Sequence, residues 1–147
     1  MMEALFKRTE CGCADCVTCC TEQPGSLIPG DMERIATYLN TTVDAIKTNF
    51  WSSDGALVMN RTTGVQFRVR TITPKLERHR GCVFLGADNR CTIHPVAPAG
   101  CSYFDTHMSP HEGQKRGVEV VRHQQDHDYQ ALRRTLDVAT SYKPRRY

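Results

Sequence analysis

Cys13-Ala14-Asp15-Cys16-Val17-Thr18-Cys19-Cys20 is the stretch around which this chain of 147 residues is organised. Its four thiols follow the spacing C-x2-C-x2-C-C. Two residues between thiols allow a short turn to direct both sulfurs at one metal centre. The spacing therefore predicts a metal or iron–sulfur site. The alternative, a disulfide knot, requires an oxidising compartment.

The conformation of this stretch decides which thiols act together. In a helix, the rotation of about 100° per residue would place Cys13, Cys16 and Cys20 within about 60° of one another. Cys19 would then serve a second centre or packing. In a loop, any of the four thiols could be a ligand, so both possibilities stay open at this point.

Composition limits the class of protein. The N-terminus has no apolar signal-peptide core, and no stretch is long and apolar enough to cross a bilayer. We therefore expect a reducing cytoplasm and no membrane partner, so the eight cysteines read as ligands or redox thiols. A net charge of +3 does not favour nucleic acid as a partner.

The rest of the chain predicts a small α+β fold: one irregular, cysteine-rich, metal-centred domain with short helices and β-hairpins. We expect a helix capped by Asp31 and ended by Asn40, and a second helix from Thr41 or Thr42 whose apolar face includes Phe50 and Trp51. A turn over 52–55, extended segments over 56–60 and 65–72, and a helix from about 125 to 140 follow. His123 and His127 would share a face of that last helix, although its polar sequence favours a solvated surface.

A second cysteine region completes the set of candidate ligands. The turn at 87–90 predicts a hairpin that brings Cys82 and Cys91 together, and a proline-rich link then leads to Cys101. These thiols are too widely spaced for one loop to build a whole site. We therefore expect them to fold back onto the first cluster.

One predicted strand offers a possible substrate site. Val65, Phe67 and Val69 alternate with polar residues, so Arg68 and Arg70 would share the opposite face. That face is either solvated or able to bind an anion such as a substrate carboxylate.

The sequence resembles the YkgJ-type cysteine-cluster family, which is described as zinc- or iron-chelating. The first motif is Cys13, Cys16, Cys19 and Cys20; a later pattern is matched at Cys82, Phe84, Leu85, Cys91, Ile93, Pro98, Cys101 and Phe104. The resemblance covers about residues 11–104 of the single domain 1–147 and leaves a histidine-containing extension over 105–147. A related motif in flagellin lysine methylases implies a [4Fe-4S] cluster more than zinc.

Departures from the family pattern suggest where chemistry could occur. His94, Ala97 and Ser102 replace a tyrosine and two arginines of the pattern. Losing two large cations near Cys101 could leave room for a ligand, and His94 could exchange a proton there near neutral pH.

These observations together predict an iron–sulfur protein, with [4Fe-4S] as cofactor and zinc as the alternative. We expect a redox or iron-dependent enzyme, an oxidoreductase acting on a small molecule or peptide, with a possible redox partner. A zinc-binding structural module and an electron-transfer or metal-handling protein are the alternatives. Site residues would be the thiols of the two cysteine regions, with His94, Arg68 and Arg70 as catalytic candidates.

Overall fold

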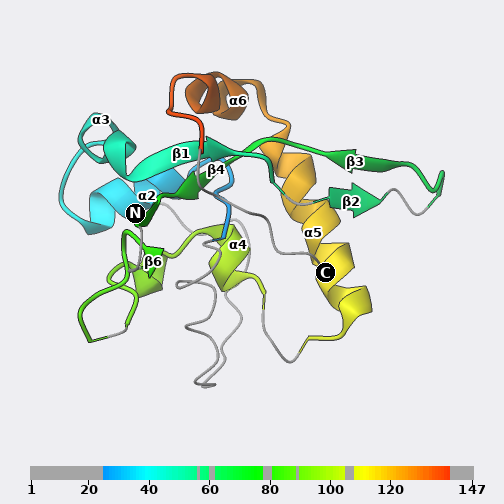
Figure 1. Ribbon diagram of the computed structural model, residues 1–147, viewed down its shortest axis with the longest axis horizontal. Coiled ribbons are helices and arrows are strands. Elements are labelled where there is room, and N and C mark those ends of the chain that lie inside the picture. Colours follow the sequence, from blue (N-terminus) through cyan, green and yellow to red (C-terminus); the bar gives the residue numbers. More distant parts are fainter. Residues whose placement is uncertain are drawn as a thin grey trace.

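The computed structural model describes residues 25–55, 57–59, 62–77, 81–88, 90–104 and 108–139. Short helices and short antiparallel strands make up this part of the chain (Figure 1), so the predicted small α+β fold is confirmed. The first 24 residues, which include the C-x2-C-x2-C-C motif, lie outside the described residues, so the predictions made for them stay predictions.

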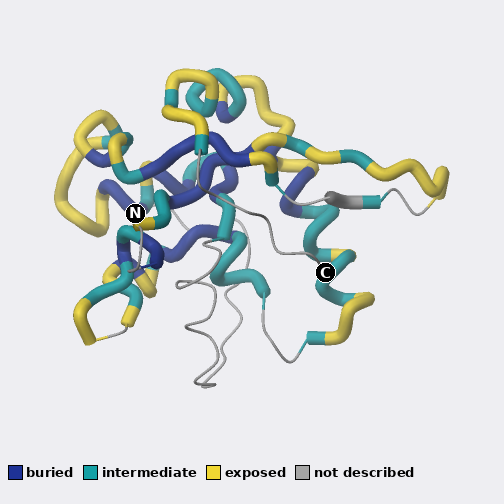
Figure 2. The backbone as a smooth tube through the Cα atoms, in the orientation of Figure 1, coloured by how far each residue is buried: buried dark blue, intermediate teal, exposed yellow. Residues whose placement is uncertain are grey.

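Three antiparallel strand pairs form the β-structure. β1 (Phe50–Ser53) pairs with β4 (Thr71–Pro74), β2 (Leu57–Met59) with β3 (Gln66–Arg68), and β5 (Leu76–Glu77) with β6 (Gly81–Cys82). The β1–β4 pair crosses the middle of the molecule, and its buried backbone contrasts with the exposed far end of the β2–β3 hairpin (Figure 2). The β1–β4 pair is therefore the central element of the fold.

The helices lie around this pair. They are α2 (Asp31–Tyr38), α3 (Val43–Ile46), α4 (Ala99–Ser102), α5 (Pro110–Gln124) and α6 (His127–Arg134), with the 3-10 helices η2 (Lys47–Asn49) and η3 (His94–Val96). Figure 1 shows α6 on one side of β1 and β4 and α4 on the other. Helix α6 contacts both strands, and α5 contacts β2.

Helix α2 forms where its apolar spacing predicts it, but its start differs. Asp31 is the first helical residue, and the N-cap is Gly30 with φ of 92°. Glycine adopts such a left-handed conformation without a steric penalty. The prediction that Asp31 caps α2 is wrong, because its carboxylate binds other backbone groups.

The second helix is shorter than predicted. Thr42 caps it by accepting a hydrogen bond from the Ala45 N–H, and α3 ends at Ile46. Phe50 and Trp51 lie in β1 instead of on a helix face, and β1 continues to Ser53, so the predicted turn at 52–55 is wrong for its first two residues. Pairing with β4 overrides the local helical pattern here, because all four residues of each strand become buried.

The extended stretch from 65 to 72 divides into β3 and the start of β4. Phe67 and Val69 are half-buried and their polar neighbours are exposed, which confirms that part of the alternation. Val65 precedes the pairing and is 58% exposed, so its predicted place in the core is wrong.

The C-terminal region contains two helices where the sequence analysis predicted one. Ser109 accepts a hydrogen bond from the Glu112 N–H, Pro110 follows as the first helical residue, and α5 begins there. Asp126 caps α6 by accepting a hydrogen bond from the Tyr129 N–H. His123 and His127 therefore lie on different helices, which contradicts the prediction that they share one face.

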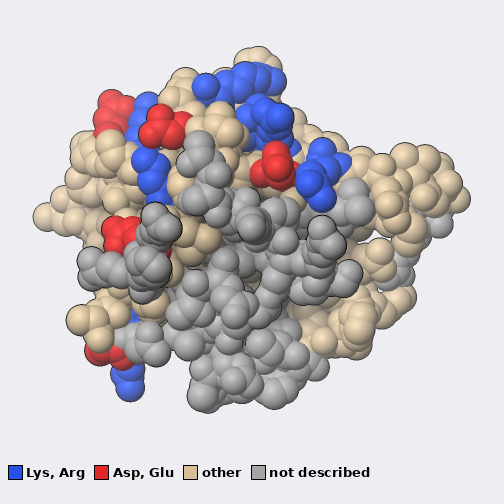
Figure 3. All heavy atoms as spheres, viewed as in Figure 1, with Lys and Arg blue, Asp and Glu red and all other residues tan. Residues whose placement is uncertain are grey.

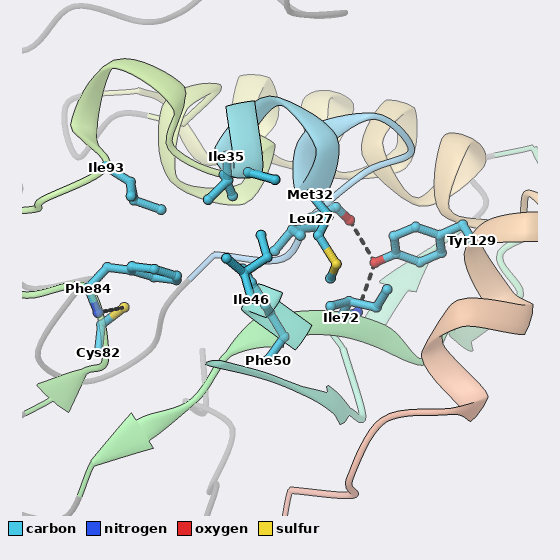
Figure 4. Packing of buried hydrophobic residues seen from close by; sticks show 11 residues of the cluster. Leu27, Met32, Ile35, Ile46, Phe50, Ile72, Cys82, Phe84, Ile93 and Tyr129 are labelled. Carbon is cyan, nitrogen blue, oxygen red and sulfur yellow. Dashed lines mark hydrogen bonds between the residues drawn. The ribbon is translucent and has the colours of Figure 1, made fainter. Parts of the chain in front are cut away.

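The main apolar core connects α2, β1, β4, η3 and α6. Its buried residues are Leu27, Met32, Ile35, Ala36, Ile46, Phe50, Ile72, Cys82, Phe84, Ile93 and Tyr129. Figure 4 shows the Tyr129 hydroxyl between Leu27 and Ile72, with Cys82 beside Phe84 at the other end of the cluster. A smaller cluster of Ile28, Ala99 and Val120 packs α4 against α5.

Candidate metal centre

Cys11 and the four motif thiols Cys13, Cys16, Cys19 and Cys20 lie outside the described residues, so their roles as ligands stay predictions. The structure does describe Cys82, Cys91 and Cys101. It also shows where the chain that follows the motif enters the fold, because Gly25 is described.

Cys101 lies where that chain enters. It sits on α4 and is partly buried, and its Sγ accepts a hydrogen bond from the Gly25 N–H, with an N···S distance of 3.1 Å. The two residues are 76 positions apart in sequence. The fold thus brings one thiol of the second cysteine region to Gly25, which follows Cys20 by five residues in the sequence.

A set of contacts that we call the seam joins residues 25–31 to residues 99–101. The Gly100 N–H donates to the Ser26 carbonyl (2.9 Å), and the Ala99 N–H donates to Asp31 Oδ2 (2.9 Å). A Cβ added at Gly25 would lie 2.2 Å from the Gly100 carbonyl carbon. Both positions of this close backbone approach therefore require glycine.

Hydrogen bonds to other parts of the fold also fix Leu27, within the segment 25–28. The Leu27 N–H donates to the Ile72 carbonyl (2.8 Å), and the Leu27 carbonyl accepts from the Tyr129 hydroxyl (2.7 Å) and from Gln124 Nε2 (2.8 Å). These partners come from β4, α6 and α5. The entry point of the chain is consequently fixed relative to Cys101.

Asp31 is the charged residue of the seam. Its side chain is buried, and Oδ2 accepts hydrogen bonds from both the Ile28 N–H (3.0 Å) and the Ala99 N–H (2.9 Å). Burial raises the pKa of this carboxyl to about 6, although the two backbone donors and Arg34, 3.4 Å away, lower it. Sequence analysis missed this role because Asp31 read as a helix cap.

Cys82 has a different environment. It is 6% exposed, belongs to the main apolar core, and its Sγ accepts a weak hydrogen bond from the Phe84 N–H at 3.5 Å. Burial raises the pKa of its thiol to about 11. A thiolate, the form that binds metal, is therefore disfavoured at Cys82 in the metal-free protein.

Cys91 lies on the predicted hairpin, but it pairs with Leu85 and not with Cys82. Leu85 and Cys91 form an antiparallel bridge, and the Gly86 N–H donates to the Arg90 carbonyl. Cys91 is close enough to Cys82 for a charge on one thiol to raise the pKa of the other. Among the described residues, no three His, Cys, Asp or Glu side chains come together as a metal site.

The three catalytic candidates are not brought together by any contact that the structure gives. His94 is exposed on η3. Arg68 and Arg70 are exposed, and the Arg70 carbonyl accepts a hydrogen bond from Gln130 on α6. Arg70 thus contacts α6, whereas Cys101 contacts Gly25. Figure 1 shows α6 and α4, the helix that carries Cys101, on opposite sides of β1 and β4.

Arg70 instead belongs to a group of positive charges. Burial lowers the pKa of Arg133, and the charges of Arg134 and Arg70 lower it further. Figure 3 shows Lys and Arg atoms gathered at the top of the view, on the side where α6 lies in Figure 1. Substrate binding by Arg68 and Arg70 stays a prediction.

None of the helices in the described ranges is long and apolar enough to span a membrane. A family model described as "CxxCxxCC: Putative zinc- or iron-chelating domain" matches residues 12–134. The matched region includes the motif, the three described cysteines, α5 and α6, and the chain belongs to this family. Neither a curated protein nor a solved structure matches the chain.

Proposed function

We propose that this member of the CxxCxxCC family holds a [4Fe-4S] cluster, with thiolates from the N-terminal motif and from Cys101 as ligands. The observation that carries the proposal is the hydrogen bond from the Gly25 N–H to Cys101 Sγ. It supports a site at which the two cysteine regions meet.

Chain length supports this meeting point. Gly25 follows Cys20 by five residues in the sequence. Five residues of fully extended chain span at most about 18 Å. This length allows Cys20 to reach Cys101 from Gly25, as the proposed site requires.

The donor set of Cys101 fits a metal-bound thiolate. A backbone N–H directed at sulfur stabilises negative charge on it, as the second-shell donors of metal sites do. The described part of the chain lacks three grouped ligands of its own. The motif thiols are therefore the proposed partners of Cys101 in such a centre.

Spacing favours an iron–sulfur cluster over zinc. Structural zinc sites combine two separated C-x2-C pairs, whereas three thiols at C-x2-C spacing plus a distant fourth are typical of [4Fe-4S] ligation. When bound, such a cluster supplies one-electron transfer or an iron that accepts a ligand. An enzymatic reaction with His94, Arg68 and Arg70 in the site is a further hypothesis that rests on this one.

The test begins with protein purified without air. Iron, sulfide and zinc are measured together with the visible spectrum near 400 nm, and we expect about four iron and four sulfide per chain. The double variant Cys13→Ser/Cys16→Ser should lose both.

Zinc without sulfide would favour the zinc-binding structural module. Full retention of metal in the double variant would contradict the proposed ligands.

A further inference from the structure

We infer that Asp31 is a positioning residue for the proposed metal centre: its carboxylate caps α4 from a distant part of the chain and so fixes the orientation of Cys101. The inference rests on the proposed function and adds to it a residue outside both cysteine regions. The residues that carry it are Asp31, Ala99 and Cys101.

Helix α4 depends on contacts with the rest of the protein. It spans only four residues, Ala99–Ser102, and its N-cap Pro98 makes no side-chain capping bond. A helix of this length is not stable by itself, and its first N–H groups need partners from outside. The Ala99 N–H finds that partner in Asp31 Oδ2 at 2.9 Å.

Three consecutive residues of α4 take part in the seam. Ala99 binds Asp31, Gly100 binds the Ser26 carbonyl, and Cys101 accepts the Gly25 N–H. Of these contacts, the first uses the side chain of its partner and the others use backbone groups of residues 25 and 26. Asp31 is therefore the position at which substitution can alter the seam without changing its backbone.

One oxygen of the Asp31 carboxylate makes both hydrogen bonds to the backbone. Oδ2 accepts from both Ile28 and Ala99, while Oδ1 is 3.4 Å from Arg34 Nη1. An asparagine can place its carbonyl oxygen at the position of Oδ2 and keep both bonds without a charge. A glutamate keeps the charge, but its extra methylene displaces the oxygens.

These two substitutions separate position from charge. We expect Asp31→Asn to retain the metal affinity of the unaltered protein, and Asp31→Ala and Asp31→Glu to lower it by about 10- to 100-fold, as loss of a supporting hydrogen bond does at metal sites. Affinity is measured by competition with a chelator without air. Circular dichroism and the melting temperature report whether each variant is folded.

A control matches the loss of stability without touching the seam. Thr73→Val leaves the buried Trp51 indole N–H without its hydrogen-bond partner on β1–β4. We expect this variant to melt earlier and to keep the metal affinity. If Thr73→Val loses metal as strongly as Asp31→Ala, the effect of Asp31 is general destabilisation and the inference is wrong.

The remaining outcomes are distinct. Should Asp31→Ala fail to fold, the comparison of Asp31→Glu with Asp31→Asn decides. Weaker metal binding by Asp31→Asn than by Asp31→Glu would show that the charge of Asp31 matters and that its cap on α4 does not. If the unaltered protein binds neither iron nor zinc, the proposed function fails; unaltered affinity in Asp31→Glu and Asp31→Ala contradicts the role of Asp31 alone.

Discussion

Cys101 and Cys82 are two thiols of the same cysteine region in opposite environments. Cys101 lies at the seam, where its sulfur accepts a backbone N–H from a residue 76 positions away. Cys82 lies in the main apolar core, and its sulfur accepts from the nearby Phe84 N–H at the longer distance of 3.5 Å. Burial raises the pKa of Cys82 to about 11.

The difference predicts that the two cysteines of this pattern have different roles. A ligand must be available as thiolate and must face the other ligands, whereas a core thiol behaves as a small apolar side chain. The Gly25 N–H at its sulfur fits Cys101 to the proposed role of ligand, and the core position of Cys82 fits that thiol to the second role. Substitutions at the two positions should therefore affect different properties.

The largest expected effect concerns metal content. Cys101→Ser removes a proposed ligand and should weaken metal binding by about 100-fold or more, since even outer-shell losses reach 10- to 100-fold. Cys82→Ser should leave iron and sulfide per chain unchanged. Elemental analysis of both variants checks this, and the reverse result would show that Cys82 is the ligand.

The seam itself can be broken without altering a thiol. A Cβ at Gly100 would lie 2.3 Å from the Ser26 nitrogen, so Gly100→Ala should lower the free energy of unfolding by about 3 kcal/mol, at the upper end for overpacking. The control is Gly117→Ala on α5, where a Cβ meets no atom within 4 Å. That variant should gain about 0.5–1 kcal/mol from helix propensity. Denaturant unfolding of both proteins measures these values, and equal effects would contradict the tight contact.

Asp31 gives the seam a pH dependence. Because its pKa is raised to about 6 from an ordinary value of 3.8, its contribution to stability is largest below pH 4 and is lost as pH rises through 6. Two pKa units correspond to about 2–3 kcal/mol.

The change is isolated by comparison with Asp31→Asn, which cannot titrate at this position. We expect Asp31→Asn to gain stability relative to the unaltered protein between pH 4 and pH 7, as measured by denaturant unfolding. A constant difference across this range would mean that the carboxyl titrates with its ordinary pKa.

The smallest expected effect lies in the core. Cys82→Ser places a hydroxyl among apolar side chains and should lower the free energy of unfolding by about 1–2 kcal/mol. Cys82→Ala removes the sulfur altogether, and we expect both variants to bind metal as the unaltered protein does. Thermal unfolding of metal-loaded protein checks the cost. An unchanged melting temperature in Cys82→Ser would place this thiol in a polar environment and weaken the comparison.

Residue spacing and capping residues predicted those features of the fold that depend on neighbours in the sequence. The position of α2, though not its N-cap, follows from residue spacing, as does the alternation at Phe67 and Val69; the cap at Thr42 follows from capping chemistry. The capping sequence at Ser109 and Pro110 was also present. It was missed because Gly113 and Gly117 weaken the helical pattern of α5.

Contacts between distant residues were not predictable in this way. The placement of Phe50 in β1 depends on pairing with Pro74, and the role of Asp31 depends on Ala99. The prediction that the second cysteine region folds back onto the first came from the wide spacing of its thiols, and the structure shows Cys101 at Gly25. The physical cause of that contact, the packing of Gly25 on Gly100, has no signature in a single sequence.

The long sequence separation across the seam also sets an order of events during synthesis. Gly25 and Cys101 are 76 positions apart, so at roughly 5–20 residues per second the ribosome adds Cys101 about 4–15 seconds after Gly25. During that interval the motif thiols already exist, but Cys101, their proposed partner, does not. Any metal delivered during that interval would meet an incomplete set of the proposed ligands, and closing of the seam would add Cys101 to it.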